Sequence, residues 1–272
     1  MTSGPGHHGD ALADWLRIRP QISWPCWSGA RPSAGAPAYD GFRDFFTTTR
    51  GSRDAEGTKQ ILTALDLALA DAAQGRRLSF DLLENWQRTV LHQPSAPFRT
   101  EPAFAKDGRE RYGLSPSTPA LFESCLSEST QPDLSLPSRA ARTYLDVLFF
   151  HPFEDGNARA AMLALAFVLA REGAPLDQVH PLQATRWADD ADGAADLAVL
   201  LGILVTAAER RLSNGRPPPS SPWSVNAENA HCRARILPHK IVECRTRSSH
   251  PSETIRVTNS SASSDSASAT RS

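Results

Sequence analysis

The sequence is poor in the residues that stabilise small secreted domains or draw a chain to charged partners. It has four cysteines among 272 residues, far apart along the chain, so it lacks the closely spaced pairs of a disulfide framework. Its formal net charge is −1, so no overall field attracts it to nucleic acid or to an anionic membrane. We therefore expect reduced cysteines, a cytoplasmic location and no direct nucleic-acid binding.

Long apolar segments are also missing. The chain does not open with a charged segment followed by an apolar one, which is the pattern of a signal peptide. The most apolar stretches, near 160–170 and 195–208, are too short or too often interrupted to span a bilayer. These shortages predict that the protein has no membrane partner.

The chain instead contains a series of amphipathic patterns, in which apolar residues recur every three or four positions. Serines before several segments and glycines or prolines after them predict helix caps and stops. The patterns predict an all-α domain with helices at 57–74, 80–92 capped by Ser79, 117–128, 139–150 capped by Ser138, 158–171, 184–191 and 194–212.

Composition divides the chain into three parts. Residues 1–40 contain many Pro, Gly and Ser and predict an irregular N-terminal arm, with a short helix near 10–18 docked on the body. Residues 41–212 form the predicted helical domain. Residues 213–272 have almost no apolar periodicity, which predicts a disordered Ser/Pro-rich tail.

One segment departs from the helical pattern. Residues 98–116 are polar and rich in turn formers, and Asp107–Gly108 is a hairpin signal between candidate strands at 101–105 and 109–113. We expect this β-hairpin to be marginally stable by itself, because a two-stranded sheet buries little surface.

The stretch HPFEDGNARAAM at 151–162 concentrates specialised side chains between two predicted helices. Gly156–Asn157 tolerates positive φ, and a curled backbone before a helix N-terminus directs several N–H groups at one anion. Arg159, in the first helical turn, has the wrong sign for the helix dipole but suits a bound phosphate. The stretch therefore predicts a phosphate-binding loop.

The acidic and basic side chains at the loop fit the same chemistry. Asp155 beside the anion nest can hold Mg²⁺, which then bridges carboxylate and phosphate. His151, at the mouth of the loop, can accept a proton from an incoming hydroxyl. Each residue alone is more often structural or solvated. In this order they predict phosphoryl or nucleotidyl transfer to a hydroxyl.

HPFEDGNAR resembles the signature of Fic (Fido) domain proteins, H-x-F-x-[DE]-G-N-[GK]-R-x-x-[RG]. The resemblance implies a Fic-type helical bundle, in which the hairpin at 98–116 is the flap that docks a target protein by strand addition. It also implies a nucleotidyltransferase that moves AMP from ATP to a Ser, Thr or Tyr hydroxyl of that protein.

The match to the motif implies a role for each residue. His151 would be the general base, and Asp155 would bind Mg²⁺. The α-phosphate of ATP would lie against Asn157 and the backbone of Gly156 and Ala158. Arg159 would grip the β-phosphate, and pyrophosphate would leave in line with the attacking hydroxyl.

A shorter match lies upstream. Ser52, Glu56 and Gly57 in SRDAEG resemble the family's inhibitory pattern, [ST]-x-x-x-E-[GN]. In that pattern the glutamate enters the nucleotide pocket and pairs with the second arginine of the motif, so the match implies autoinhibition. The alternative is that the segment merely begins a helix, where the dipole favours an acid.

The sequence departs from the signature at two positions. Ala158 replaces a glycine, and Met162 replaces the second arginine, which in the family binds the γ-phosphate. Losing one charged hydrogen-bond partner costs about 1.5–3 kcal/mol, so ATP binding should weaken roughly ten- to a hundredfold. Arg99, Arg109 or Arg111 on the hairpin could replace the missing cation.

Three functions are therefore open: protein adenylylation, transfer from another nucleotide or phospho-donor on the same fold, and non-catalytic binding of a nucleotide or partner protein. The sequence also leaves the target protein and any homo-oligomer open. The high Ala and Arg content indicates a GC-rich bacterial genome.

Overall fold

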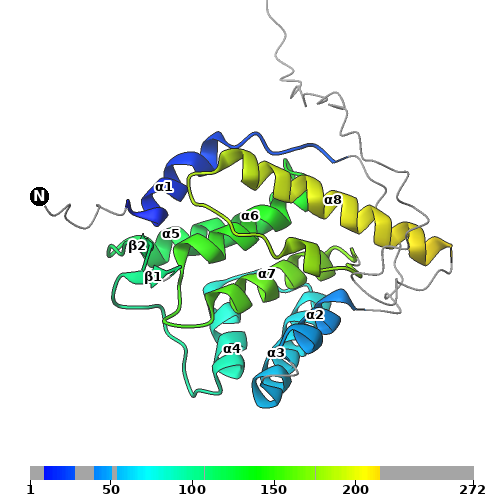
Figure 1. Cartoon of the computed structure of the whole chain (residues 1–272), viewed down its shortest axis with the longest axis horizontal. Helices are drawn as coiled ribbons and strands as arrows, with labels where there is room; N and C mark the ends of the chain where they lie inside the picture. Colours follow the sequence, from blue (N-terminus) through cyan, green and yellow to red (C-terminus); the bar gives the residue numbers. More distant parts are fainter. Residues whose placement is uncertain (1–8, 28–39, 51–53, 107, 175, 215–272) are drawn as a thin grey trace, which may run out of the picture. The chain divides into compact units, whose positions relative to one another are not determined.

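The described residues form a helical body with one short hairpin at its edge, near α5 (Figure 1). The structure is a computed structural model that describes residues 9–27, 40–50, 54–106, 108–174 and 176–214, all within one compact unit, Met1–Ile241. The elements are α1 Ala11–Ile18, α2 Gly41–Arg50, α3 Ala55–Ala73, α4 Phe80–Leu91, β1 Ala103–Ala105, β2 Glu110–Tyr112, α5 Thr118–Ser127, α6 Leu136–Phe150, α7 Asn157–Arg171 and α8 Ala191–Ser213.

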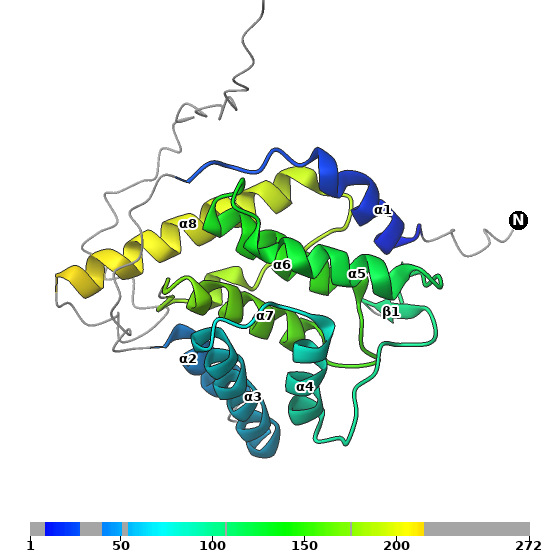
Figure 2. The same cartoon turned by 180° about the vertical axis from the view of Figure 1, so that it is seen from behind.

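Helix α7 is the centre of the core. It packs against α6 on one side and against α3 and α4 on the other (Figures 1 and 2). Most of its side chains are buried, and many of them are alanines, which let neighbouring helices approach closely. Because the motif loop leads directly into α7, this largely buried helix fixes the position of that loop.

Helix α8 lies along α6 and covers it. By length and composition alone α8 could cross a membrane, which the interrupted pattern at 195–208 did not predict. Its inner apolar positions, among them Leu197 and Leu201, are buried in the core, whereas Val199, Ile203 and Leu212 are exposed. An ion pair from Arg211 to Asp177 fixes its last turn. In this structure α8 therefore acts as a core helix.

The N-terminal helix α1 is fixed to the body by a buried polar network. Asp146, buried in α6, accepts hydrogen bonds from Trp15 Nε1 at 3.0 Å and from Arg19 Nε at 2.7 Å. Arg19 also pairs with Glu128 at 3.1 Å. The predicted short helix is confirmed, and this part of the arm belongs to the core.

The predicted hairpin is also confirmed. Strand β1 pairs antiparallel with β2, with Phe104 opposite Arg111, and Gly108 has the positive φ of +79° that the turn requires. Asp107 lies outside the described residues. The carboxylate of Asp10 caps α1 and also accepts the N–H of Gly113 at 2.9 Å, so α1 supports the end of the hairpin.

Two helix predictions are wrong. Ser138 does not cap α6, which begins at Leu136, because Pro137 suits a first helical turn; the Ser138 hydroxyl instead donates to the Pro25 carbonyl at 2.8 Å. No separate helix forms at 184–191, where the chain is irregular with a turn at 188–189 until Asp190 caps α8.

The structure also differs from the sequence prediction at α2 and at Cys26. Helix α2 was not predicted at all, although Phe42, Phe45 and Phe46 are buried in the core. Cys26 is disulfide-bonded, so the expectation of reduced cysteines is wrong at this residue. The expected tail lies outside the described residues beyond Asn214.

The buried network predicts a stability difference between two arginines of the N-terminal segment. Arg19→Ala should lower the free energy of unfolding by about 3–5 kcal/mol, because it leaves the Asp146 carboxylate buried without its main partner. Arg17→Ala removes only an exposed pair with Asp14 and should cost about 0–1 kcal/mol. Urea denaturation measures both; equal losses would contradict the assigned role of Asp146.

Candidate active site

The motif loop begins where α6 ends. His151 has φ +49° and ψ +55°, a left-handed conformation that breaks the helix, and its N–H still donates to the Val147 carbonyl at 3.2 Å. Pro152 follows and cannot donate a further helical hydrogen bond. This end geometry turns the His151 side chain out of the helix and places it at the mouth of the loop.

The His151 ring has a defined tautomer. Its Nδ1 lies 2.8 Å from the Leu148 carbonyl oxygen, which can only accept, so Nδ1 carries the proton and Nε2 keeps its lone pair. Burial lowers the pKa of His151, and the nearby Arg99 lowers it further, against the opposing effects of Leu148 and Glu110. The imidazole is therefore neutral at pH 7 and can accept a proton at Nε2.

Asn157 closes the loop from within. Its amide Oδ1 accepts the Phe153 N–H at 2.9 Å, and its Nδ2 donates to the Phe153 carbonyl at 2.7 Å. The Phe153 ring is buried and stacks on Phe80 at 5.5 Å. The Asn157 side chain is thus occupied in holding the loop, and any contribution to an anion site would have to come from the backbone around it.

Gly156 provides the curled backbone before α7. It has φ +78°, and a Cβ there would lie 2.4 Å from Gln87 Nε2, so a side chain fits neither the conformation nor the space. Gln87 is fully buried and donates to the Asp155 carbonyl at 2.6 Å. At the start of α7 the Arg159 N–H donates to the Gly156 carbonyl at 2.9 Å, which leaves the two N–H groups before it as candidates to bind an anion.

The charged pair of the loop joins Asp155 to Arg159 at 3.0 Å. The Asp155 side chain is 79% exposed and the Arg159 side chain 17% exposed, so the carboxylate faces water at the start of α7. No group of three or more metal-ligating side chains occurs in the described part of the chain. A single open carboxylate fits Mg²⁺ of the kind that takes its other ligands from phosphate and water.

The two departures from the signature have different surroundings. Ala158 is exposed, so its methyl group meets no protein atom that would force the loop open. Met162 is 4% exposed and packs in the core among the apolar residues of α7. It therefore acts as a core residue, and the position that should carry a second cation carries none.

The hairpin arginines, which the sequence offers as replacements for that cation, make contacts of their own. Arg99 is buried and donates to the carbonyls of Glu101, Gly113 and His151 at 2.6–2.8 Å. Arg111 pairs with Asp10 at 3.5 Å, on the side of α1. Arg109 donates to the Lys106 carbonyl at 2.8 Å. The first two side chains therefore have structural partners away from α7.

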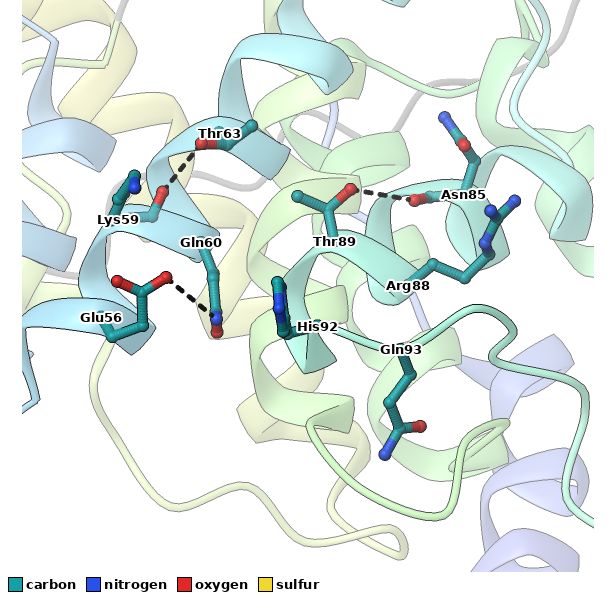
Figure 3. Close-up of a pocket in the computed structure, with 9 residues that line it drawn as sticks. All are labelled: Glu56, Lys59, Gln60, Thr63, Asn85, Arg88, Thr89, His92 and Gln93. Atoms are coloured by element: carbon teal, nitrogen blue, oxygen red, sulfur yellow. Dashed lines mark hydrogen bonds between the residues drawn. The ribbon is translucent and has the colours of Figure 1, made fainter.

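Glu56 lies at the start of α3. It is exposed in the first turn of α3 and lines an open groove of about 460 Å³ between α3 and α4, together with Lys59, Arg88 and His92 (Figure 3). Its carboxylate accepts a hydrogen bond from Gln60 at 3.4 Å. Ser52 lies outside the described residues, and Gly57 is buried beside the capping residue of α3. The inhibitory role of this segment stays a prediction.

Three residues that shape the site were missed as such. Tyr112 stacks on His151, Gln87 supports Asp155, and Arg99 fixes the end of α6. Gln87 could have been found, because a polar residue on the apolar face of a predicted helix suggests a buried hydrogen bond. The other two depend on contacts between segments that no local pattern reveals.

The loop closure predicts a stability effect at Asn157. Asn157→Ala should lower the free energy of unfolding by about 1–3 kcal/mol, because it leaves the buried N–H and carbonyl of Phe153 without partners. Asn85→Ala is the matched control: Asn85 is exposed on α4, and its change should stay within about 0.5 kcal/mol. If the two variants unfold at the same denaturant concentration, Asn157 does not hold the loop.

Part of the chain is similar to a known protein family. Residues 77–169, from the approach to α4 into α7, match the model of the Fic/DOC family. No curated protein sequence matches the chain. A Fic-domain signaling protein from Bacteroides thetaiotaomicron has 22% identity and a TM-score of 0.50, covering 64% of this chain and 81% of its own.

Two other solved structures are less similar. IbpAFic2 covalently tethered to Cdc42 has 14% identity and a TM-score of 0.48, covering 72% of this chain and 70% of its own. Fic-1 from C. elegans has 14% identity and a TM-score of 0.44, covering 75% and 71%. The match at 77–169 contains the hairpin and the motif loop, so this segment is similar to the Fic/DOC family, and the helical body has the Fic-type fold.

Proposed function

We propose that this protein is an adenylyltransferase that moves AMP from ATP to a Ser, Thr or Tyr hydroxyl of a target protein. The observation that supports it best is the tautomer of His151. With Nδ1–H bound to Leu148, Nε2 can accept a proton at the mouth of a loop that ends at the N-terminus of α7. A proton acceptor and an anion site on one loop suit attack of a hydroxyl on a phosphate.

The proposed step transfers one proton and exchanges one P–O bond. The target hydroxyl oxygen forms a bond to the α-phosphorus, its proton passes to His151 Nε2, and the bond from that phosphorus to pyrophosphate breaks. The first N–H groups of α7 and the Arg159 guanidinium would stabilise the charge on the phosphate oxygens. Asp155 would hold Mg²⁺, which when bound neutralises part of the charge on the leaving pyrophosphate.

The hairpin is the proposed docking site for the target. Strand β1 pairs with β2 along one edge only, and Phe104 on β1 is 62% exposed. An extended segment of a target could add to the other edge of β1 by backbone hydrogen bonds, with its hydroxyl side chain next to His151. Tyr112 at the end of β2 contacts His151, so the hairpin lies next to the proposed base.

Met162 supports a second candidate, a donor other than ATP. An apolar side chain in the core offers no charge to a third phosphate, so a nucleotide or other phospho-donor with a shorter phosphate tail loses nothing at this position. Phosphorylation is the variant of this candidate in which a terminal phosphate moves. The position of the transferred label distinguishes the two candidates.

Labelled ATP tests the proposal directly. Label at the α-phosphate should transfer to protein, and His151→Ala should reduce the rate by about 10²–10⁴-fold, because it removes the proton acceptor. The rate should fall when the pH drops through the pKa of His151, which burial places below that of an ordinary histidine. His92→Ala, at an exposed histidine of α4, is the control and should leave the rate unchanged. Transfer of γ-label instead would select phosphorylation, and no transfer from any donor would refute catalysis.

Met162→Arg tests what the second departure costs. An arginine at this position can extend its charged end towards the loop while its stem stays in the core. If ATP is the donor, its affinity should rise roughly ten- to a hundredfold in calorimetry. Met162→Leu keeps the volume without the charge and should leave affinity unchanged. A denaturation curve for each variant separates a change in binding from a loss of folding.

A further inference from the structure

The ring of Tyr112 lies flat against the imidazole of His151. The two ring centroids are 4.3 Å apart, and the planes are inclined by 13°. Tyr112 ends β2 and is 3% exposed, so this contact is buried at the base of the hairpin. Neither the anion site nor the docking edge requires an aromatic residue at this position.

The phenol is fixed by a polar partner of its own. The Tyr112 hydroxyl donates to Glu110 Oε2 at 2.5 Å, and the other carboxylate oxygen of Glu110 accepts from Lys106 Nζ at 2.6 Å. Glu110 is buried, and burial together with this carboxylate raises the pKa of Tyr112, so the phenol stays neutral and remains a donor. This hydrogen bond therefore restricts rotation of the Tyr112 side chain and keeps its ring in place against His151.

The same chain of contacts leaves the hairpin. Lys106 Nζ also donates to the Arg186 carbonyl at 2.5 Å and lies 3.7 Å from the ring centroid of Trp187. Arg186 and Trp187 belong to the irregular segment that precedes α8. The orientation of Tyr112 thus depends on contacts at both ends of the hairpin, which makes it a defined surface for the imidazole.

Two contacts then determine where His151 Nε2 points. The hydrogen bond to Leu148 fixes one edge of the ring, and the stack on Tyr112 fixes its plane. We propose that Tyr112 is a positioning residue, which holds the imidazole in the orientation and tautomer that leave Nε2 directed into the site. The inference rests on the proposed role of His151 as the proton acceptor.

Nitrogen NMR of the histidine rings tests the inference without any activity. In the wild type, His151 should show a single tautomer with the proton on Nδ1, and NOEs should join its ring to that of Tyr112. In Tyr112→Leu we expect a mixture of tautomers and a pKa moved upward, because water replaces the ring; Arg99 and Glu110, the charged groups facing the imidazole, are unchanged. Tyr112→Phe keeps the stack and should restore the single tautomer.

Tyr144→Leu is the matched control. Tyr144 is buried in α6 and loses the same atoms, but it makes no ring contact with His151, so its spectrum should keep the wild-type tautomer. A folded Tyr112→Leu protein with an unchanged His151 signal would overturn the proposal. If that variant does not fold, the wild type decides: no NOE between the two rings would overturn it as well.

Activity gives a second readout. If the adenylyl transfer proposed above occurs, Tyr112→Leu should lower kcat by up to about a hundredfold with little change in KM for ATP, because a displaced base slows the step without weakening the anion site. Tyr112→Phe should recover most of the rate. A wild type that transfers no label would refute the enzymatic function, whereas the tautomer measurement would still decide the role of Tyr112.

Discussion

The site depends on one buried guanidinium. Arg99 donates through its side chain to the carbonyls of Glu101, Gly113, Phe150 and His151, and its backbone N–H donates to Pro152. Two of these carbonyls end α6, where a cation also matches the helix dipole, and the other two flank the hairpin. One side chain therefore joins the helix that presents the histidine to the hairpin that covers it.

The reactivity of His151 follows from this arrangement. Its backbone is held in a left-handed conformation at the end of α6, so its ring can reach the Leu148 carbonyl of the preceding turn. Burial of the imidazole lowers its pKa and favours the neutral ring, and the nearby Arg99 adds to this effect. At the other end of the loop, Asn157 binds the backbone of Phe153 and fixes the start of α7. The proposed proton acceptor and the proposed anion-binding backbone are thus held by separate contacts within one short loop.

Much of this could be predicted from the sequence, for definite reasons. Helix α4 has strong apolar periodicity, α3 and α7 are long runs rich in alanine and leucine, and the hairpin carries a glycine that needs positive φ at its turn. The motif loop is a contiguous segment, so its order along the chain is also its order in space. The predicted start of α6 was two residues too late, because serine is a common helix cap but Ser138 is buried and bonds the Pro25 carbonyl instead. The predicted helix at 184–191 does not form, and its sequence lacks the apolar periodicity of the core helices.

The contacts that tune the site were beyond the sequence for a different reason. Arg99 and Tyr112 are far from His151 along the chain, and only the packing of the hairpin on α6 brings them together. Asn157 matches the motif by identity, yet its side chain supports the loop from behind. At Met162 the sequence alone shows that the cation of the motif is replaced, and the structure shows that this side chain is buried in the core.

We propose that this loop is preformed to bind a phosphate next to a neutral His151. A crystal structure with a non-hydrolysable ATP analogue and Mg²⁺ tests this most directly. We expect the α-phosphate within hydrogen-bond distance of the first two N–H groups of α7, with His151 Nδ1 still bound to Leu148. A nucleotide bound instead in the groove between α3 and α4, or a loop that must unfold to admit it, would contradict this proposal.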